Sequence, residues 1–243
     1  MNLADRVVLV TGGARRIGRA IVERLADSGC RVAVHYQTSR DEAQALVEQL
    51  RAAGREADAL PADLADPAAC GGLVEAVLRR FGRLDVLVNN ASAFAPMTLE
   101  DFSVAVWDRM LRVNATAPCV LAHAARNALR AAGGRIVNLH DAATLRPWPD
   151  HVAYMVSKGA LDTLTRVLAR ALAPEVNVVG IAVGVAAWPE HYDESLRERL
   201  VARIPLRRAG SPADIAAAVH YVLRDGDYLT GTIIPVDGGR HVV

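Results

Sequence analysis

The segment VVLVTGGARRIGRAIVERLA, residues 7–26, contains in sequence order an apolar strand, a glycine-rich turn and an amphipathic helix. The apolar run 7–10 is β-branched, and Ile17, Ile21 and Leu25 recur about one helical turn apart. A glycine-rich turn at the start of a helix exposes backbone N–H groups that can hold a pyrophosphate. The segment therefore predicts the first strand–turn–helix unit of a dinucleotide-binding fold.

Apolar runs recur along the chain and alternate with stretches of helical spacing. The runs cover residues 31–36, 84–90, 135–140, 176–183 and 232–239, and one more strand ends at Asp63. Such nearly continuous runs are typical of strands buried on both faces of a parallel sheet. We therefore expect residues 1–243 to form a single α/β domain, a doubly wound, Rossmann-like parallel sheet, with ligands bound at the carboxyl ends of its strands.

Composition argues against several classes of partner. The 28 Lys and Arg and 27 Asp and Glu residues leave a formal charge of +1, which predicts no binding to nucleic acid or to a membrane surface. No leader segment and no apolar stretch of roughly 20 residues is recognisable. The spacing of Cys30, Cys70 and Cys119 suits neither a metal site nor a disulfide. A cytoplasmic protein without a bound metal is expected.

The end of the second strand indicates which dinucleotide binds. Residues 35–40, HYQTSR, offer no carboxylate that would hold a ribose 2′-hydroxyl and repel a 2′-phosphate. Arg15, Arg40 and the Ser39 hydroxyl could bind that phosphate, so NADP(H) is the expected cofactor. The alternative is that both arginines are only solvated. Asp63 could reach the adenine edge, whereas Asp66 before Pro67 is expected to cap a helix.

Tyr154 and Lys158 are four residues apart in a stretch of helical spacing, so both side chains project from one face. An ammonium beside a phenol favours the phenolate and lowers the pKa of the tyrosine, which suits proton transfer near neutral pH. Alone, such a pair could arise by chance on an amphipathic helix.

Together, the glycine turn, LVNNAS (87–92), Tyr154 with Lys158, and VDGG (236–239) resemble the short-chain dehydrogenase/reductase family over essentially the entire chain. The resemblance implies that Asn89, Asn90 and Ala91 support the strand ends beside the cofactor and that Asn114 acts in a proton relay through Lys158. It also implies a homotetramer.

In that family a serine lies thirteen residues before the tyrosine, and this chain has Asp141 there. An ionised carboxylate would repel the alkoxide that forms when a ketone is reduced. It would suit a substrate with ring N–H or amino donors, or a C=N bond that gains a proton together with hydride. A pterin has both features.

Arg16 in the glycine turn, HY at 35–36, NNASAF at 89–94 and the spacing from Asp141 to Tyr154 resemble the pteridine reductase branch of the family. That branch implies that Arg16 contacts the cofactor phosphates and the pterin, and that Ser92 and Phe94 line the substrate pocket. Phe94 would stack the pterin ring; alternatively, it is a core residue. Trp188 is expected near the pocket.

The expected catalytic residues are Asp141, Tyr154, Lys158 and Asn114, and the expected substrate contacts are Arg16, Ser92, Phe94, Asp141, Tyr154 and Trp188. The cofactor is expected to contact Gly12, Arg15, Arg16, Ile17, Gly18, His35, Tyr36, Ser39, Arg40, Asp63, Leu64, Asn90, Ala91, Tyr154, Lys158 and Gly184. Three positions depart from the family or its branch: Thr38 stands where the branch often has an arginine, and Gly180 and Val183 replace an Asn and a Pro.

Three functions are compatible with these residues. The first is NADPH-dependent reduction of a dihydropterin or dihydrofolate ring to its tetrahydro form. The second is carbonyl reduction, as by a 3-oxoacyl reductase, and the third is an NADP-binding regulator without catalysis. Residues 185–210 interrupt the alternation with an amphipathic helical stretch, which we interpret either as a substrate lid or as a surface excursion.

Overall fold

The structure is a computed structural model that describes residues 1–188 and 193–243. Its centre is a seven-stranded, entirely parallel sheet with the strand order β3-β2-β1-β4-β5-β6-β7. The order reverses at β1, where the chain crosses from one half of the sheet to the other, and this is the point at which open α/β sheets bind ligands. The doubly wound parallel sheet expected from the sequence is confirmed.

Each predicted apolar run contains a strand, and most of these residues are buried because helices cover both faces of the sheet. The strands are β1 (Val7–Val10), β2 (Arg31–Tyr36), β3 (Ala57–Pro61), β4 (Val86–Asn89), β5 (Arg135–Asp141), β6 (Asn177–Val183) and β7 (Ile233–Val236).

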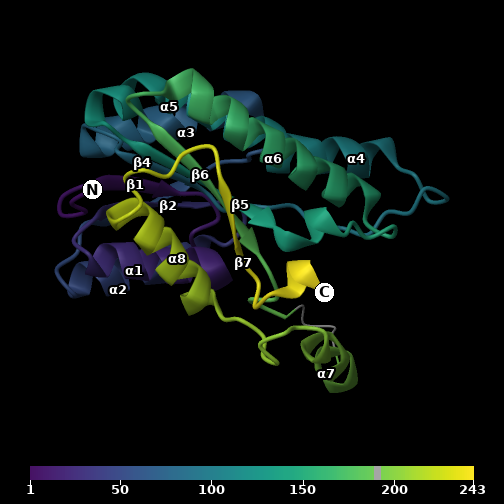
Figure 1. Cartoon of the computed structure of the whole chain (residues 1–243). Coiled ribbons are helices and arrows are strands. Elements are labelled where there is room, and N and C mark those ends of the chain that lie inside the picture. The colour runs from purple at the N-terminus through teal and green to yellow at the C-terminus, as the bar shows by residue number, and fades with distance from the viewer. Residues whose placement is uncertain (189–192) are drawn as a thin grey trace.

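The helices form a layer on each side of the sheet (Figure 1). One layer contains α1 (Arg16–Asp27), α2 (Arg40–Ala52) and α8 (Pro212–Arg224). The other contains α3 (Pro67–Phe81), α5 (Ala117–Ala132) and α6 (Val152–Leu172), with α4 (Val104–Leu111) packed against α6. A separate helix, α7 (Glu194–Ala202), projects beyond the sheet and has no buried residue.

Local sequence explains where several helices begin. The carboxylate of Asp66 accepts a hydrogen bond from Ala68 N, and Pro67 is the first residue of α3, as the sequence predicts. Ser211 and Asp214 form a reciprocal capping box at the start of α8. In contrast, no side chain caps α1 at Arg15, so the N-terminus of α1 is open toward the loop after β1.

Among the described residues, three short irregular helices lie outside the two main helix layers. They are the π-helix η1 (Arg112–Thr116), the 3₁₀ helix η2 (Ala142–Leu145) and the 3₁₀ helix η3 (Arg240–Val242). Of the predicted lid at 185–210, the structure describes all but residues 189–192. None of the described helices is long and apolar enough to cross a lipid bilayer.

Candidate active site

The turn after β1 depends on its glycines for close backbone contact. Gly12 has a φ of +61°, in the left-handed region that favours glycine. A Cβ on Gly18 would lie 2.1 Å from the carbonyl oxygen of Gly12 and 2.7 Å from Nδ2 of Asn90. The turn and the first residues of α1 therefore lie tightly together, which leaves backbone N–H groups of an uncapped helix directed at the end of the sheet.

Arg16 has a φ of 51°, although it is not a glycine. This conformation costs a non-glycine residue of the order of 1 kcal/mol. The guanidinium reaches across the site and donates a hydrogen bond from Nη2 to the carbonyl oxygen of Trp188 at 3.3 Å. The side chain therefore occupies a position over the site that a glycine in the turn would leave empty.

His35, the fifth residue of β2, fixes the glycine turn after β1 by hydrogen bonding. Gly12 N donates to its Nδ1 at 3.0 Å, and its Nε2 donates to Ala62 O at 3.1 Å. Burial lowers the pKa of His35 to about 4, and the hydrogen bond to Ala62 only partly opposes that shift. The neutral imidazole thus links the turn after β1 to the segment after β3.

Thr11 and Asn90 join the turn to the end of β4. Oγ1 of Thr11 accepts hydrogen bonds from the backbone N–H groups of Asn90 and Ala91 at 2.9 and 3.0 Å, and Nδ2 of Asn90 donates to Thr11 O at 2.8 Å. Nδ2 of Asn89 donates to Oδ1 of Asn138 at 2.8 Å. Thr11 was not predicted as a site residue because its role is visible only when β1 and β4 lie side by side.

A cavity of about 950 Å³ lies at the carboxyl ends of β1, β2, β4, β5 and β6. All the candidate site residues line it except three: Arg40, Asp63 and Asn114. Phe94 is 48% exposed, so its alternative interpretation as a core residue is wrong. Residues that the sequence did not single out also line the cavity, including Arg109, Trp148, His151, Arg203 and Arg240.

The end of the cavity next to β2 is lined by Arg15, Gln37, Thr38 and Ser39. Nη1 of Arg15 lies 3.4 Å from Oε1 of Glu42, and both side chains are well exposed. Arg40, the first residue of α2, is exposed and outside the cavity, contrary to its predicted place. Of the two arginines that the sequence suggests for a 2′-phosphate, Arg15 therefore lines the cavity and Arg40 does not.

Asp63 is also displaced from its predicted place. Its Oδ1 accepts hydrogen bonds from Ala65 N at 3.0 Å and from Nε2 of Gln37 at 2.8 Å, and the residue is exposed outside the cavity lining. The carboxylate is used to fix the turn after β3. Leu64, the next residue, lines the cavity instead.

Tyr154 and Asp141 meet at the catalytic end. Asp141 is the last residue of β5, and Tyr154 lies in the first turn of α6; the Tyr154 hydroxyl donates to Oδ2 of Asp141 at 2.7 Å. Oδ1 of Asp141 accepts from Ala143 N at 2.8 Å and thereby caps η2. The capping bond and the phenol hold the carboxylate in one orientation.

The pKa of Tyr154 is raised well above its ordinary value, the opposite of the sequence prediction. Burial is the main cause, and the charge of Asp141 and the hydrogen bond to it add to the effect; a hydrogen bond with Ser92 opposes it. The Lys158 ammonium, whose Nζ lies 5.9 Å from the centre of the Tyr154 ring, does not outweigh these effects. In this arrangement the phenol holds its proton.

Lys158 is buried and is the single lysine among 243 residues. Its Nζ donates to the carbonyl oxygen of Leu139 at 2.9 Å. Burial lowers the pKa of Lys158 to about 8, against the opposing charges of Asp141 and Asp162. Every other basic residue among the 28 Lys and Arg residues is an arginine. The sequence alone therefore marks Lys158 as an unusual residue.

Asn114 lies in the π-helix η1, outside the cavity lining. Its amide accepts from Ala93 N at 2.8 Å and donates to Ala93 O and to Oγ of Ser157, both at 2.9 Å. Ser157 in turn donates to Tyr154 O at 2.7 Å. Asn114 thus connects the segment bearing Phe94 to the helix bearing Tyr154, and it makes no direct bond to Lys158.

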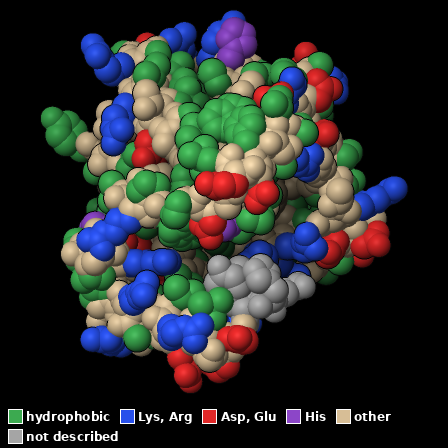
Figure 2. All heavy atoms as spheres, turned by 90° about the vertical axis from the view of Figure 1, so that its right-hand side faces the viewer, with side chains coloured by type: hydrophobic (Ala, Val, Ile, Leu, Met, Phe, Trp, Pro, Cys, Tyr) green, Lys and Arg blue, Asp and Glu red, His purple; other side chains and the backbone are tan. Residues whose placement is uncertain are grey.

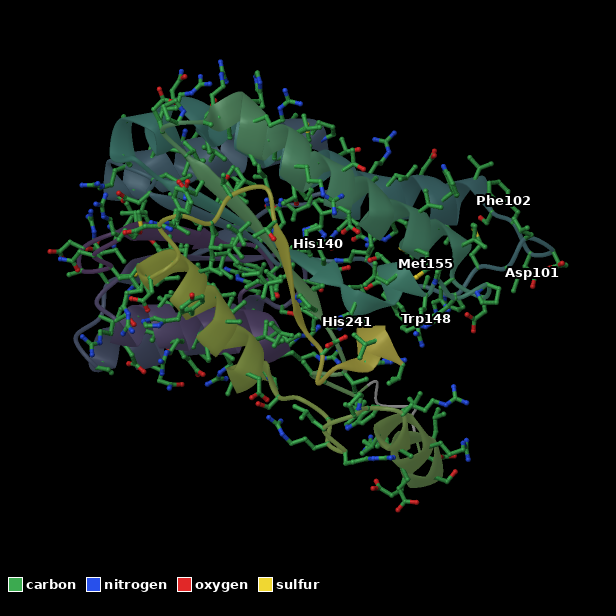
Figure 3. All side chains as sticks on the ribbon, viewed as in Figure 1. Asp101, Phe102, His140, Trp148, Met155 and His241 are labelled. Carbon is green, nitrogen blue, oxygen red and sulfur yellow. The ribbon has the colours of Figure 1, made fainter. Side chains whose placement is uncertain are left out.

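An aromatic wall, formed by Phe94, Trp148, His151 and Tyr154, borders the cavity. The rings of Phe94 and His151 are stacked with centres 4.7 Å apart, and Phe94 meets Tyr154 edge to face at 4.8 Å. Trp148 meets His151 edge to face at 5.5 Å. Trp148 packs in one cluster with Met155 of the first turn of α6, and the two residues are labelled near one another in Figure 3.

The departures at Gly180 and Val183 have different structural consequences. A Cβ on Gly180 would lie 2.6 Å from the ring of His140, whose Nδ1 is 2.5 Å from Oδ1 of Asp162 and whose Nε2 is 3.0 Å from Oγ1 of Thr165. The glycine therefore leaves room for a buried histidine beside Asp141. Val183 and Gly184 line the cavity directly.

Comparison with known proteins identifies the class. The chain matches the Enoyl-(Acyl carrier protein) reductase family over residues 12–241. It is 38% identical to an uncharacterized oxidoreductase of Methylorubrum extorquens, over 98% of both chains, and 34% identical to a 3-oxoacyl-(acyl-carrier-protein) reductase of Staphylococcus aureus, over 96% of this chain and 97% of that protein. The chain therefore belongs to the short-chain dehydrogenase/reductase family and is an oxidoreductase.

A solved structure is similar in fold and in sequence. The FolM alternative dihydrofolate reductase 1 of Brucella canis, in complex with NADP, matches with a TM-score of 0.94 and 38% identity, over all of this chain and 96% of that one. The relatives therefore include both an acyl-carrier-protein reductase and a dihydrofolate reductase, which differ in substrate. Among the described residues, no group of three His, Cys, Asp or Glu side chains is placed to hold a metal ion.

Proposed function

We propose that the protein uses NADPH to reduce the ring of a dihydropterin or dihydrofolate to its tetrahydro form. The observation that supports this proposal most strongly is the 2.7 Å hydrogen bond between Tyr154 and Asp141. It couples a proton donor to a fixed acceptor at the place where the substrate would lie. The resemblance also implies a cytoplasmic homotetramer, and we extend the proposal to that state.

The residues present fit NADP(H). Backbone N–H groups at the uncapped start of α1 suit the pyrophosphate, and Arg15 with Ser39 suits the 2′-phosphate at the end of β2. Asn90, Lys158 and Gly184 line the cavity between that end and Tyr154. When bound, NADPH supplies hydride. The FolM neighbour contains NADP on a similar fold, which supports this assignment.

Asp141 would orient the substrate by accepting hydrogen bonds from the substrate's N–H groups. A carboxylate accepts hydrogen bonds from an exocyclic amino group and a ring N–H, and a reduced pterin carries both. The same carboxylate would disfavour the negative oxygen that develops when a ketone is reduced. Tyr154 holds its proton next to that carboxylate, so it can donate when a ring nitrogen gains hydrogen.

Phe94 and Arg16 would fix the plane of the heterocycle. Phe94 is half exposed inside the cavity and already stacks on His151, so its other face is suited to a flat ring. Arg16 reaches the opposite side of the site from a strained backbone, and its guanidinium can bind a pterin oxygen. We propose that residues 185–210 close over this ring, because Trp188, Leu200 and Arg203 line the cavity.

Reduction of a carbonyl is the second candidate, since the Staphylococcus aureus relative is a 3-oxoacyl reductase. Asp141 disfavours this chemistry, because its carboxylate stands where that reaction needs a neutral hydrogen-bond donor. The first experiment measures NADPH oxidation at 340 nm with dihydrobiopterin, dihydrofolate, a β-keto ester and no substrate. Turnover of the two heterocycles supports the proposal, turnover of the ester alone rejects it in favour of carbonyl reduction, and NADPH binding without turnover indicates a regulator.

Tyr154→Phe provides the complementary test. The variant lacks the hydroxyl that donates to Asp141, so we expect turnover to fall by at least about 100-fold, in the range typical for loss of a general acid. NADPH binding, followed by fluorescence titration, should change little. A variant with the full stopped-flow rate would remove Tyr154 from the chemistry.

A further inference from the structure

A second cavity of about 770 Å³ adjoins the first beside Asp141. The two cavities share five lining residues: Asp141, Trp148, Gly184, Arg203 and Arg240. Trp148, which follows η2, and His241, which belongs to the C-terminal η3, both line the second cavity and lie at the same end of the sheet in Figure 3. A substrate whose ring occupies the first cavity could therefore extend past Trp148 into the second.

The lining of this second cavity is strongly basic. It contains four arginines from three separate segments: Arg146 after η2, Arg203 and Arg207 after α7, and Arg240 in η3. On the face shown in Figure 2, blue Lys and Arg side chains gather on the lower half, where α7 lies. The acidic side chain in the lining is Asp141, which is already hydrogen-bonded to Tyr154 and Ala143.

The four arginines are largely unused by the protein itself. Within residues 1–188 and 193–243, none of them forms an ion pair, although the structure has ion pairs for many other arginines. The Arg240 guanidinium lies 5.8 Å above the centre of the Trp148 ring, and Nη1 of Arg207 donates to Ala202 O at 2.5 Å. His241 also lines the cavity, but its Nδ1 lies 2.9 Å from Oδ2 of Asp237. Four arginines that form no ion pair among the described residues constitute a site for several negative charges.

We propose that the second cavity binds the glutamate tail of a folate substrate and favours tails with several glutamates. This inference rests on the proposed function and names its substrate more narrowly. The pteridine ring would lie against Phe94 and Asp141, the p-aminobenzoyl ring would pass Trp148, and the carboxylates would meet the arginines. A pterin without a tail would leave the second cavity unused.

The test compares three substrates that share a ring: dihydropteroate, which has no glutamate, dihydrofolate with one, and dihydrofolate triglutamate with three. We expect KM to fall about tenfold from the first to the last, with kcat within about twofold, because the tail adds binding energy away from the reacting atoms. The difference should shrink as salt rises from low to 0.3 M, since exposed arginines are screened. Equal KM values for the three substrates would overturn the proposal.

Arg146→Gln/Arg207→Gln is the decisive variant, because both side chains line the second cavity and neither lines the first. The triglutamate KM should rise toward that of dihydropteroate, whose own KM should not change, because two of the four arginines are removed. Arg208→Gln is the matched control: Arg208 is adjacent, exposed and paired with Asp214 at 3.3 Å, and it does not line the cavity. An equal loss in the control variant would reject the cavity in favour of general surface charge.

The failure of the proposed function can be distinguished from failure of this inference. If no folate is turned over, calorimetry with NADP⁺ present measures binding of pteroate and of folate triglutamate. Tighter binding of the triglutamate, lost in the double variant, keeps the cavity as a polycarboxylate site and rejects only the reaction. Equal binding rejects the cavity assignment.

Discussion

Arg16 combines a conformational cost with a position in the cavity. Its φ of 51° is one that glycine adopts freely, so Arg16→Gly should leave stability unchanged or raise it by up to about 1 kcal/mol. The variant loses the guanidinium that faces the site, so kcat/KM for dihydrobiopterin should fall about 10- to 100-fold. Thermal unfolding and steady-state kinetics measure the two effects separately. Arg16→Lys keeps the positive charge, so its kcat/KM should lie between those of the parent and of Arg16→Gly. Full activity of Arg16→Gly would show that the arginine does not bind substrate.

Asp141 determines both the preferred substrate and the pKa of Tyr154. Asp141→Ser removes two of the three causes that raise this pKa, so the alkaline limit of activity should move to lower pH. The serine also restores a neutral donor, so the ratio of β-keto ester to dihydropterin turnover should rise by about tenfold or more. The pH profile of kcat with each substrate measures both changes. A variant with the same profile and full pterin activity would contradict this assignment of the carboxylate.

Site residues that belong to one local sequence motif could be predicted. Site residues that depend on contacts between distant segments could not. Gly12, Gly18, Tyr154 and Lys158 belong to local patterns, and all four line the cavity. Arg40 and Asp63 were misplaced because sequence gives a residue's position after a strand but not the direction of its side chain.

The pKa of Tyr154 was mispredicted for a related reason. Spacing brings Lys158 to the same face of α6, but the ammonium bonds to Leu139, and burial outweighs its charge. Trp148 and His151 were missed because the bridge between Met97 and His151, which joins the segment after Phe94 to the start of α6, is a long-range contact that sequence does not reveal.

The π-helix η1 explains how Asn114 reaches its partners. A π-turn inserts an extra residue into a helical run, and between α4 and α5 it places the Asn114 amide against Ala93 and Ser157. Hydrophobic periodicity could predict the strands of the sheet, because burial on both faces leaves a strong apolar signal. It could not predict η1, since a single π-turn barely changes the pattern of apolar residues around it.

Asn114→Ala tests this connection. The substitution leaves the N–H and C=O of Ala93 and the hydroxyl of Ser157 without their partner, so the free energy of unfolding should fall by about 2 to 3 kcal/mol. The segment bearing Phe94 should shift, which would raise KM for the heterocycle more than for NADPH. Urea unfolding and steady-state kinetics measure these effects. A variant with lower kcat, unchanged KM and unchanged stability would instead favour a direct part in the proton relay.

Stability of the entire fold should depend on pH through its buried histidines. Burial lowers the pKa of His35 from 6.5 to about 4, and it also lowers that of His140. Between pH 6.5 and 4 the unfolded chain binds protons that the folded chain does not, so the free energy of unfolding must fall as pH falls through this window. His35 alone accounts for about 3 kcal/mol of that loss, since each pKa unit corresponds to about 1.4 kcal/mol.

His35→Gln separates this contribution from the others. Glutamine can accept from Gly12 N and donate to Ala62 O as the neutral imidazole does, but it does not titrate. Urea unfolding at intervals from pH 7 to 4 should therefore give a shallower decline for the variant than for the parent. His123→Gln, at an exposed histidine of α5, should decline as the parent does. If His35→Gln kept the parent's full decline, a neutral His35 would not hold the turn after β1. The turn would then be held to β2 by the backbone hydrogen bond from Gly13 N to His35 O.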